Sequence, residues 1–112
     1  MAMSDSETTV SELRELVEEF VTERDWQPFH TPKNISMALA IEASELMEHF
    51  QWMTTEQSTA VRDDAETFLG VREELADVVT YGLALANRLD IDLAATIEEK
   101  MVKNRQKYPL GS

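Results

Sequence analysis

Apolar residues recur every three or four positions along most of the chain, which is the spacing of amphipathic α-helices. The pattern predicts a first helix over about residues 11–24. Thr8 or Thr9 can cap its start, and Glu12 lies three residues after Thr9, as in a capping box. The preceding residues 1–8 are mostly polar, and we expect them to be disordered.

Two prolines, Pro28 and Pro32, interrupt the helical pattern because each removes a backbone donor and disfavours a helical neighbour. The loop around them carries two aromatic residues and a histidine, so we expect it to fold over the helices and to line a pocket. The pattern then predicts a helix from Pro32 or Lys33 to about Trp52, followed by a short helical segment from Thr54 or Thr55 to about Arg62. A further helix should run from Asp63 or Asp64 to Leu89. The last helix should run from Leu93 to about Lys107, with Asp92 as its cap.

No segment has the pattern of a β-strand, so the predicted fold is all-α: a four- to five-helix up-and-down bundle in one domain over residues 1–112. A domain of this size buries only part of its surface, and we expect the bundle to be completed by oligomerisation. Gly70 and Gly82 lie inside a predicted helix, where close helix approach, ligand access or simple tolerance could each explain them.

The charge of the chain excludes several classes of partner. Twenty-two acidic residues against ten Lys and Arg give a net charge of −12, which would repel a nucleic-acid polymer or an anionic membrane. The sequence also has no cysteine, no apolar run long enough to span a membrane and no secretory signal pattern. These features predict a cytoplasmic protein, and they leave a free nucleotide with its divalent cation as a compatible ligand.

Carboxylates stand on the apolar stripes of two predicted helices. Glu42 lies three residues after Leu39 and four before Leu46, so it should face inward, with Glu45 one turn further on. The later helix repeats the arrangement with a second pair, Glu74 and Asp77, in a run expected to be largely buried.

Carboxylates gathered inside a bundle need a compensating positive charge, because each desolvated anion is costly and its neighbours repel it. Oxygen ligands without cysteine or a histidine pair suit Mg²⁺, with Mn²⁺ as a substitute. The alternative is that each acidic pair belongs to a solvated helix face. A ferritin-like di-iron site is disfavoured, since neither His30 nor His49 has a glutamate three residues before it.

Aromatic and basic residues extend this candidate site. Trp52 and Tyr81 share the helix faces of the acids and could stack on a nucleobase or belong to the core. His49 lies four residues after Glu45 and could support the site or be a core-edge residue. Four basic residues near the C-terminus could bind an anion or complement the helix dipole: Lys100, Lys103, Arg105 and Lys107.

Four motifs across nearly the whole chain resemble the MazG-like all-α nucleoside triphosphate pyrophosphohydrolase superfamily, and within it the dCTP pyrophosphatase branch. The motifs are Glu-Arg-Asp-Trp-Gln-Pro-Phe-His at 23–30, Glu-Ala-Ser-Glu-Leu-Met-Glu-His-Phe-Gln-Trp at 42–52, Glu-Glu-Leu-Ala-Asp-Val-Val-Thr-Tyr at 73–81, and Lys-Met-Val-Lys-Asn-Arg-Gln-Lys-Tyr-Pro at 100–109.

The resemblance implies a role for each group of residues. It implies that Mg²⁺ is held by Glu42, Glu45, Glu74 and Asp77. It further implies that base and sugar are surrounded by Trp26, His30, Trp52 and Tyr81, and that the phosphates meet Lys100, Asn104, Arg105 and Tyr108. The first acidic pair is often preceded by a small residue in this family, whereas Ile41 stands here, with no evident consequence for the metal.

The resemblance also implies an assembly and a reaction. Members form dimers or tetramers with active sites lined by more than one subunit, and we favour a tetramer built from two dimers. The expected reaction converts a deoxynucleoside triphosphate, dCTP or a modified dCTP, to the monophosphate and diphosphate, as in nucleotide-pool house-cleaning. We expect Glu45 to orient or deprotonate the attacking water and Lys100 to stabilise the leaving diphosphate.

Two alternatives to this function stay open at the level of sequence. One is a related hydrolase acting on dUTP or on a broad range of deoxynucleoside triphosphates. The other is an acidic helical interaction module that needs no metal and has no catalytic activity.

Overall fold

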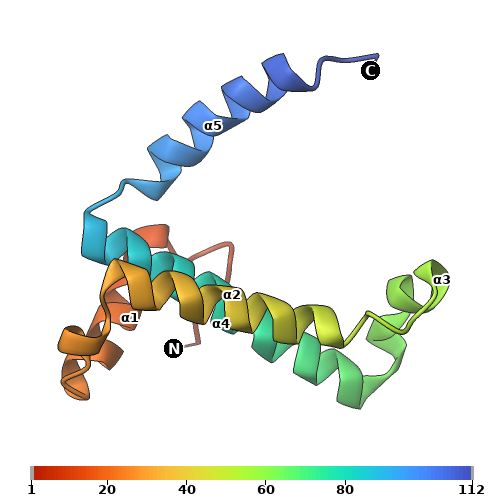
Figure 1. The fold of residues 1–112 in the computed structure, drawn as a ribbon, viewed down its shortest axis with the longest axis horizontal. Coiled ribbons are helices and arrows are strands. Elements are labelled where there is room, and N and C mark those ends of the chain that lie inside the picture. The colour runs from red at the N-terminus through yellow and green to blue at the C-terminus, as the bar shows by residue number, and fades with distance from the viewer. Residues whose placement is uncertain (1, 112) are drawn as a thin grey trace.

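A computed structural model describes residues 2–111. All the regular secondary structure in these residues is helical, which confirms the all-α prediction. Figure 1 shows the order of the elements along the chain. The α-helices are α1 (Val10–Glu23), α2 (Pro32–Glu48), α3 (Thr55–Thr59), α4 (Ala65–Leu89) and α5 (Leu93–Lys107), with short 3-10 turns η1 (Gln27–Phe29) and η2 (Val61–Asp63).

Side-chain caps fix where the helices begin. Thr9 caps α1 in a full capping box: its Oγ1 accepts from the Glu12 amide at 3.1 Å, and the Glu12 carboxylate accepts from the Thr9 amide at 3.1 Å. The carboxylate of Asp64 accepts from the Thr67 amide to start α4, and Asp92 caps α5 in the same way. The predicted caps of these three helices are therefore confirmed.

Helix α2 ends four residues earlier than predicted. It stops at Glu48 instead of continuing to about Trp52, because the backbone changes from i→i+4 to i→i+3 hydrogen bonding at His49. The Phe50 amide donates to the Met47 carbonyl at 2.9 Å, and the Met53 amide donates to the Phe50 carbonyl at 2.9 Å. The chain then turns into the extended residue Thr54, which caps α3.

The segment before α1 contains a turn in which the Glu7 and Thr8 amides both donate to the Ser4 carbonyl. The expected disorder of residues 1–8 stays a prediction, and its first residue lies outside the described part of the chain.

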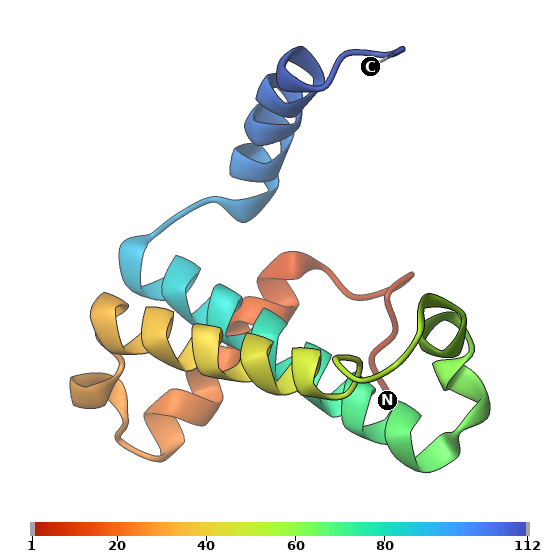
Figure 2. The same ribbon diagram turned by 45° about the vertical axis from the view of Figure 1, so that its right-hand side comes forward.

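The centre of the fold is the antiparallel pair of α2 and α4, with α1 packed on α4 (Figures 1 and 2). Ile35 of α2 is 2% exposed, and it is the largest fully buried side chain among the described residues. The other buried apolar residues are Val21, Leu83, Ala84 and Ala86. This small core lies at the end of α4 where α1 crosses, so the opposite end of the α2–α4 pair has little cover.

Helix α5 projects away from the other helices (Figure 2), so the predicted bundle is not closed within one chain. The departure begins at Asp90, whose left-handed backbone (φ 52°) ends α4, a conformation that aspartate tolerates better than most residues. Within residues 2–111, no helix is both long and apolar enough to cross a membrane.

A single chain exposes more surface than a compact monomer of its mass. Its accessible area is 8887 Å², against roughly 6,300 Å² for a compact protein of 12.8 kDa. Its radius of gyration is 16.6 Å, whereas about 13 Å is usual for this length. Large apolar side chains remain at the surface, and Ile41, Met47 and Ile97 are each more than half exposed.

Hydrogen bonds between Arg14 and Asn87 tie α1 to the end of α4. The Arg14 Nε donates to Asn87 Oδ1 at 2.9 Å, and Asn87 Nδ2 donates back to the Arg14 carbonyl at 3.1 Å. Arg14 also donates to the carbonyl of Ile91, in the connection to α5. These partly buried groups therefore fix the position from which α5 departs.

We expect Asn87→Ala to lower the free energy of unfolding by about 1 to 3 kcal/mol, because the Arg14 guanidinium loses a partly buried partner. Urea unfolding at one fixed protein concentration measures the change. Arg88→Ala, at the exposed neighbouring position, is the control and should have little effect. Equal stability of the two variants would contradict the assigned role of Asn87.

Candidate metal centre and adjoining cleft

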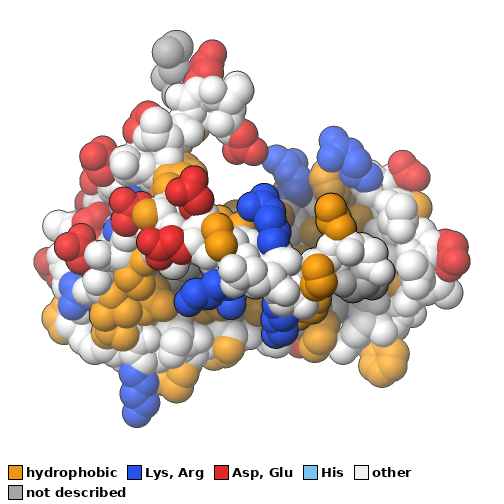
Figure 3. Space-filling view, turned by 90° about the horizontal axis from the view of Figure 1, so that it is seen from above, with side chains coloured by type: hydrophobic (Ala, Val, Ile, Leu, Met, Phe, Trp, Pro, Cys, Tyr) orange, Lys and Arg blue, Asp and Glu red, His pale blue; other side chains and the backbone are white. Residues whose placement is uncertain are grey.

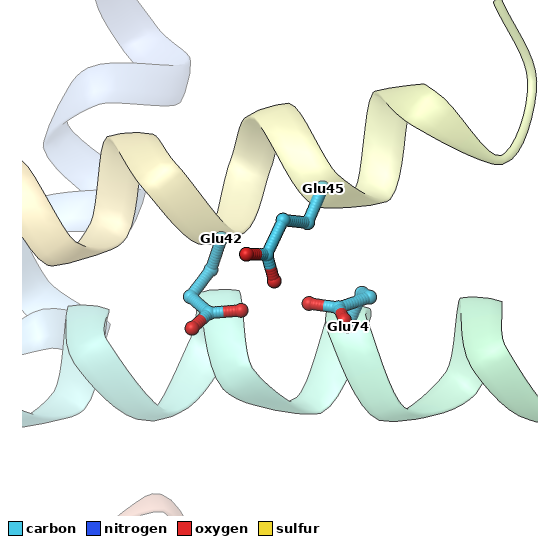
Figure 4. A group of neighbouring side chains, drawn as sticks. All are labelled: Glu42, Glu45 and Glu74. Atoms are coloured by element: carbon cyan, nitrogen blue, oxygen red, sulfur yellow. The ribbon is translucent and has the colours of Figure 1, made fainter.

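Three carboxylates from two helices converge between α2 and α4. Figure 4 shows Glu42 and Glu45 pointing from α2 toward Glu74 of α4. One oxygen from each residue lies within 4.8 Å of the other two. The antiparallel helices bring these residues together because each lies on the face that its helix turns to the other.

Among the described residues, no basic side chain forms an ion pair with this acidic cluster. The ion pair found in residues 2–111 joins Arg24 to Glu23 at 3.2 Å, on a different helix. Glu42 Oε2 and Glu74 Oε2 are buried without a hydrogen-bond partner. Buried acceptors are almost always paired, so two orphaned oxygens at one place indicate a ligand site.

The pKa of Glu42 also shows that the carboxylates lack a compensating cation. Hydrogen bonding of its protonated form to Glu74, then burial, then hydrogen bonding and repulsion by Glu45 raise this pKa from 4.5 to about 7. The metal-free cluster therefore holds a proton near neutral pH, where an isolated glutamate would be ionised.

The donor set fits a hard divalent cation. All three residues offer carboxylate oxygens, two of those oxygens have no other partner, and the two helices hold the three groups close together. Mg²⁺ or Mn²⁺ would take such ligands and keep further positions open for water or phosphate oxygens.

Asp77, the fourth predicted ligand, lies at the edge of the cluster and outside this group of three. Its charge raises the pKa values of both Glu42 and Tyr81, so it lies near both side chains. The prediction that its surroundings are buried is wrong for the single chain, in which Ala76, Asp77 and Val79 are exposed.

A cleft of about 630 Å³ opens beside the cluster, and Glu42 and Asp77 form part of its wall. Three of the residues predicted to bind the base, Trp26, His30 and Tyr81, line it, and their base-binding role stays a prediction. The rings of Trp26 and His30 are stacked with centroids 6.0 Å apart, and Tyr81 follows at 6.4 Å from His30. His30 Nδ1 is buried without a partner, so a polar group of a ligand could bind there.

Helix α1 contributes cleft residues that the sequence pattern did not identify. Phe20 packs edge-on against Trp26, with ring centroids 5.3 Å apart, and its other side is covered by the Arg24 guanidinium. Thr80 and Ala84 of α4 also line the cleft, and the rest of the α1 wall is formed by Leu16, Val17 and Val21. Their helical spacing predicted only a core face, because periodicity does not distinguish a core from the wall of a cleft.

Trp52 lies far from this cleft within the same chain. It follows the C-terminal end of α2, whereas Trp26 and His30 precede the N-terminal end (Figure 1). The 17 residues of α2 separate these ends by about 25 Å. Trp52 is 89% exposed, so it and Trp26 could surround one base only if they came from different subunits.

The predicted phosphate-binding residues also stand apart from the cluster in a single chain. All of them lie on or just after the projecting helix α5: Lys100, Asn104, Arg105 and Tyr108. A single chain therefore brings together three of the predicted metal ligands and three of the residues predicted to bind the base, and it holds Trp52 and the predicted phosphate-binding residues apart from them.

Comparisons with known proteins relate the chain to one family. The sequence model of the MazG-like family matches residues 37–112. The chain is 40% identical to dCTP pyrophosphatase 1 of Rattus norvegicus over 104 residues and 41% identical to that of Homo sapiens over 103 residues. These alignments cover 93% and 92% of the chain, and 61% of each relative, so the chain spans about three fifths of their length.

A solved structure is similar over the whole fold. It is a pyrophosphatase from Archaeoglobus fulgidus, 34% identical, with a TM-score of 0.83, and the match covers 96% of this chain and 99% of that one.

The raised pKa of Glu42 predicts how pH affects the metal-free protein. Between about pH 4.5 and 7 the folded state holds a proton that the unfolded chain releases. Stability should therefore fall as pH rises through this window. Glu42→Gln has no such proton, so its stability should depend less steeply on pH.

Urea unfolding in EDTA at several pH values between about 5 and 8 compares the two proteins. The difference between their curves isolates Glu42 from the remaining acids. Parallel curves would show that Glu42 titrates normally and that the cluster is not strained.

Proposed function

The chain belongs to the MazG-like family, and we propose that it is a metal-dependent pyrophosphohydrolase converting dCTP, or a modified dCTP, to the monophosphate and diphosphate. One observation carries this proposal: an uncompensated carboxylate cluster adjoins an aromatic cleft, and Glu42 belongs to both. A metal-bound triphosphate and a stacked base need these two features side by side. The role we infer is removal of unwanted nucleotides from the cytoplasmic pool.

The choice of base rests on similarity to the dCTP pyrophosphatases. The rings of Trp26, His30 and Tyr81 favour a flat base of any kind, and the buried His30 Nδ1 offers one polar contact to it. dUTP or a broad set of deoxynucleoside triphosphates would fit the same cleft, so a panel of substrates is needed to rank them.

Within the cluster, we assign Glu42, Glu45 and Glu74 to the metal, with Asp77 completing the set. Bound Mg²⁺ would neutralise phosphate oxygens and orient the triphosphate for in-line attack by water. Glu45 is the carboxylate assigned to orient that water and to accept its proton.

Charge on the departing diphosphate requires cations that the cluster itself does not contain. We propose that a second copy of the chain supplies them from α5, with Lys100 stabilising the leaving group and Asn104, Arg105 and Tyr108 contacting the phosphates. Trp52 of a further neighbouring subunit would reach the base in the same assembly.

Exposed apolar surface supports this assembly. The face in Figure 3 shows apolar side chains at the surface among the charged ones. Helix α5 carries exposed apolar side chains of its own: Ile97, Met101 and Val102 are between 42% and 55% exposed. A tetramer made of two dimers would bury this surface and complete each site.

Glu45→Gln should reduce dCTP turnover in Mg²⁺ by about 100-fold or more, because the proton acceptor is lost while the side chain keeps its size. Circular dichroism should show an unchanged helical spectrum. Glu48→Gln, on an exposed turn of the same helix, is the matched control and should retain activity. Near-normal turnover by the Glu45 variant would contradict its role.

Sites shared between subunits predict complementation. Glu45→Gln and Lys100→Ala chains should each be inactive alone, yet co-expression should restore up to about a quarter of wild-type activity for randomly mixed dimers. One site of each mixed dimer then takes both intact residues from different chains. Activity no higher than the sum of the two parents would show that Lys100 acts within its own chain or not at all.

A further inference from the structure

A contact between His49 and Gly70 lies one helical turn beyond the acidic cluster. His49, the residue that ends α2, follows Glu45 by four residues, and Gly70 precedes Glu74 by four residues on α4. The two helices run antiparallel (Figure 1), so the two pairs face each other in the same register. The contact and the pair of ligands therefore share one line along the helix interface.

The imidazole of His49 occupies space that only a glycine leaves free. A Cβ on residue 70 would lie 2.6 Å from His49 Cε1 and 3.1 Å from its Nε2. Real Cβ atoms do not approach other atoms so closely, so the ring rests directly on the backbone of α4. By contrast, Gly82 in the same helix has nothing within 4 Å of such a Cβ.

We propose that Gly70 and His49 act as positioning residues: their contact sets the separation of α2 and α4, and so the distance at which Glu45 and Glu74 meet a divalent cation. This inference rests on the proposed function of the cluster. The ring acts as a spacer through its shape, and neither residue belongs to the group of metal-binding carboxylates.

The cation makes this spacing important. Mg²⁺ requires near-ideal octahedral geometry with short bonds to oxygen, so a shift of one helix by a few tenths of an ångström weakens its binding. The ligands of the cluster come from both helices. A shift of one helix relative to the other therefore changes the distances between these ligands. Residues that orient metal ligands typically affect metal affinity by 10- to 100-fold.

The test is calorimetric titration of Mn²⁺ into the nucleotide-free full-length protein. Gly70→Ala should weaken Mn²⁺ binding roughly tenfold or more, while Gly82→Ala, the same change on the same helix, should leave it unchanged. The double variant His49→Ala with Gly70→Ala should recover most of the affinity, because the added methyl group takes the space that the ring vacated.

A second pair of variants leaves Gly70 untouched, in case Gly70→Ala does not fold. His49→Ala removes the spacer and should bind Mn²⁺ more weakly, and His49→Phe should also bind it more weakly, because its larger ring would push α4 away from α2. Wild-type affinity in both variants would overturn the spacer role, since it would show that the size of the side chain at residue 49 does not set the ligand geometry.

The outcomes separate this inference from the proposed function. Mn²⁺ binding by the wild type with equal affinity in Gly70→Ala would overturn the positioning role and leave the proposed function intact. Absence of Mn²⁺ binding in the wild type would overturn both.

Discussion

Repulsion among the carboxylates of Glu42, Glu45 and Glu74 is the constraint on which the rest of the structure depends. Two of their oxygens are buried without a partner, and hydrogen bonding of the protonated form to Glu74, burial and then the charge of Glu45 raise the pKa of Glu42 to about 7. A fold gains nothing from such a group of acids, because each desolvated charge costs stability unless something positive neutralises it. A bound cation would therefore explain why α2 and α4 pair with these carboxylates between them.

The rest of the chain is arranged around that site. Helix α1 and the loop before α2 build an aromatic cleft on one side of the cluster. Helix α5 extends away from it with basic and apolar residues exposed. The small core and the excess surface of a single chain have one explanation if the functional unit contains several copies, since each copy would cover the apolar faces of another and complete its site.

The sequence predicted the features that depend on local interactions. The caps at Thr9, Asp64 and Asp92 were predictable because each forms with residues three positions away. The inward face of Glu42 followed from helical periodicity. The exposure of Asp77 and the departure of α5 were not predictable in this way, because both depend on which surfaces are covered in space. The aromatic wall built by α1 looked like ordinary core for the same reason.

The central claim is that this site converts a deoxynucleoside triphosphate to its monophosphate with the help of a divalent cation. The most direct test incubates the full-length protein with dCTP in Mg²⁺ or in EDTA and separates the nucleotide and phosphate products by ion-exchange chromatography. We predict dCMP and diphosphate in equal amounts with Mg²⁺ and neither product with EDTA. Release of dCDP and phosphate, or no turnover of dCTP and the other deoxynucleoside triphosphates, would contradict the account.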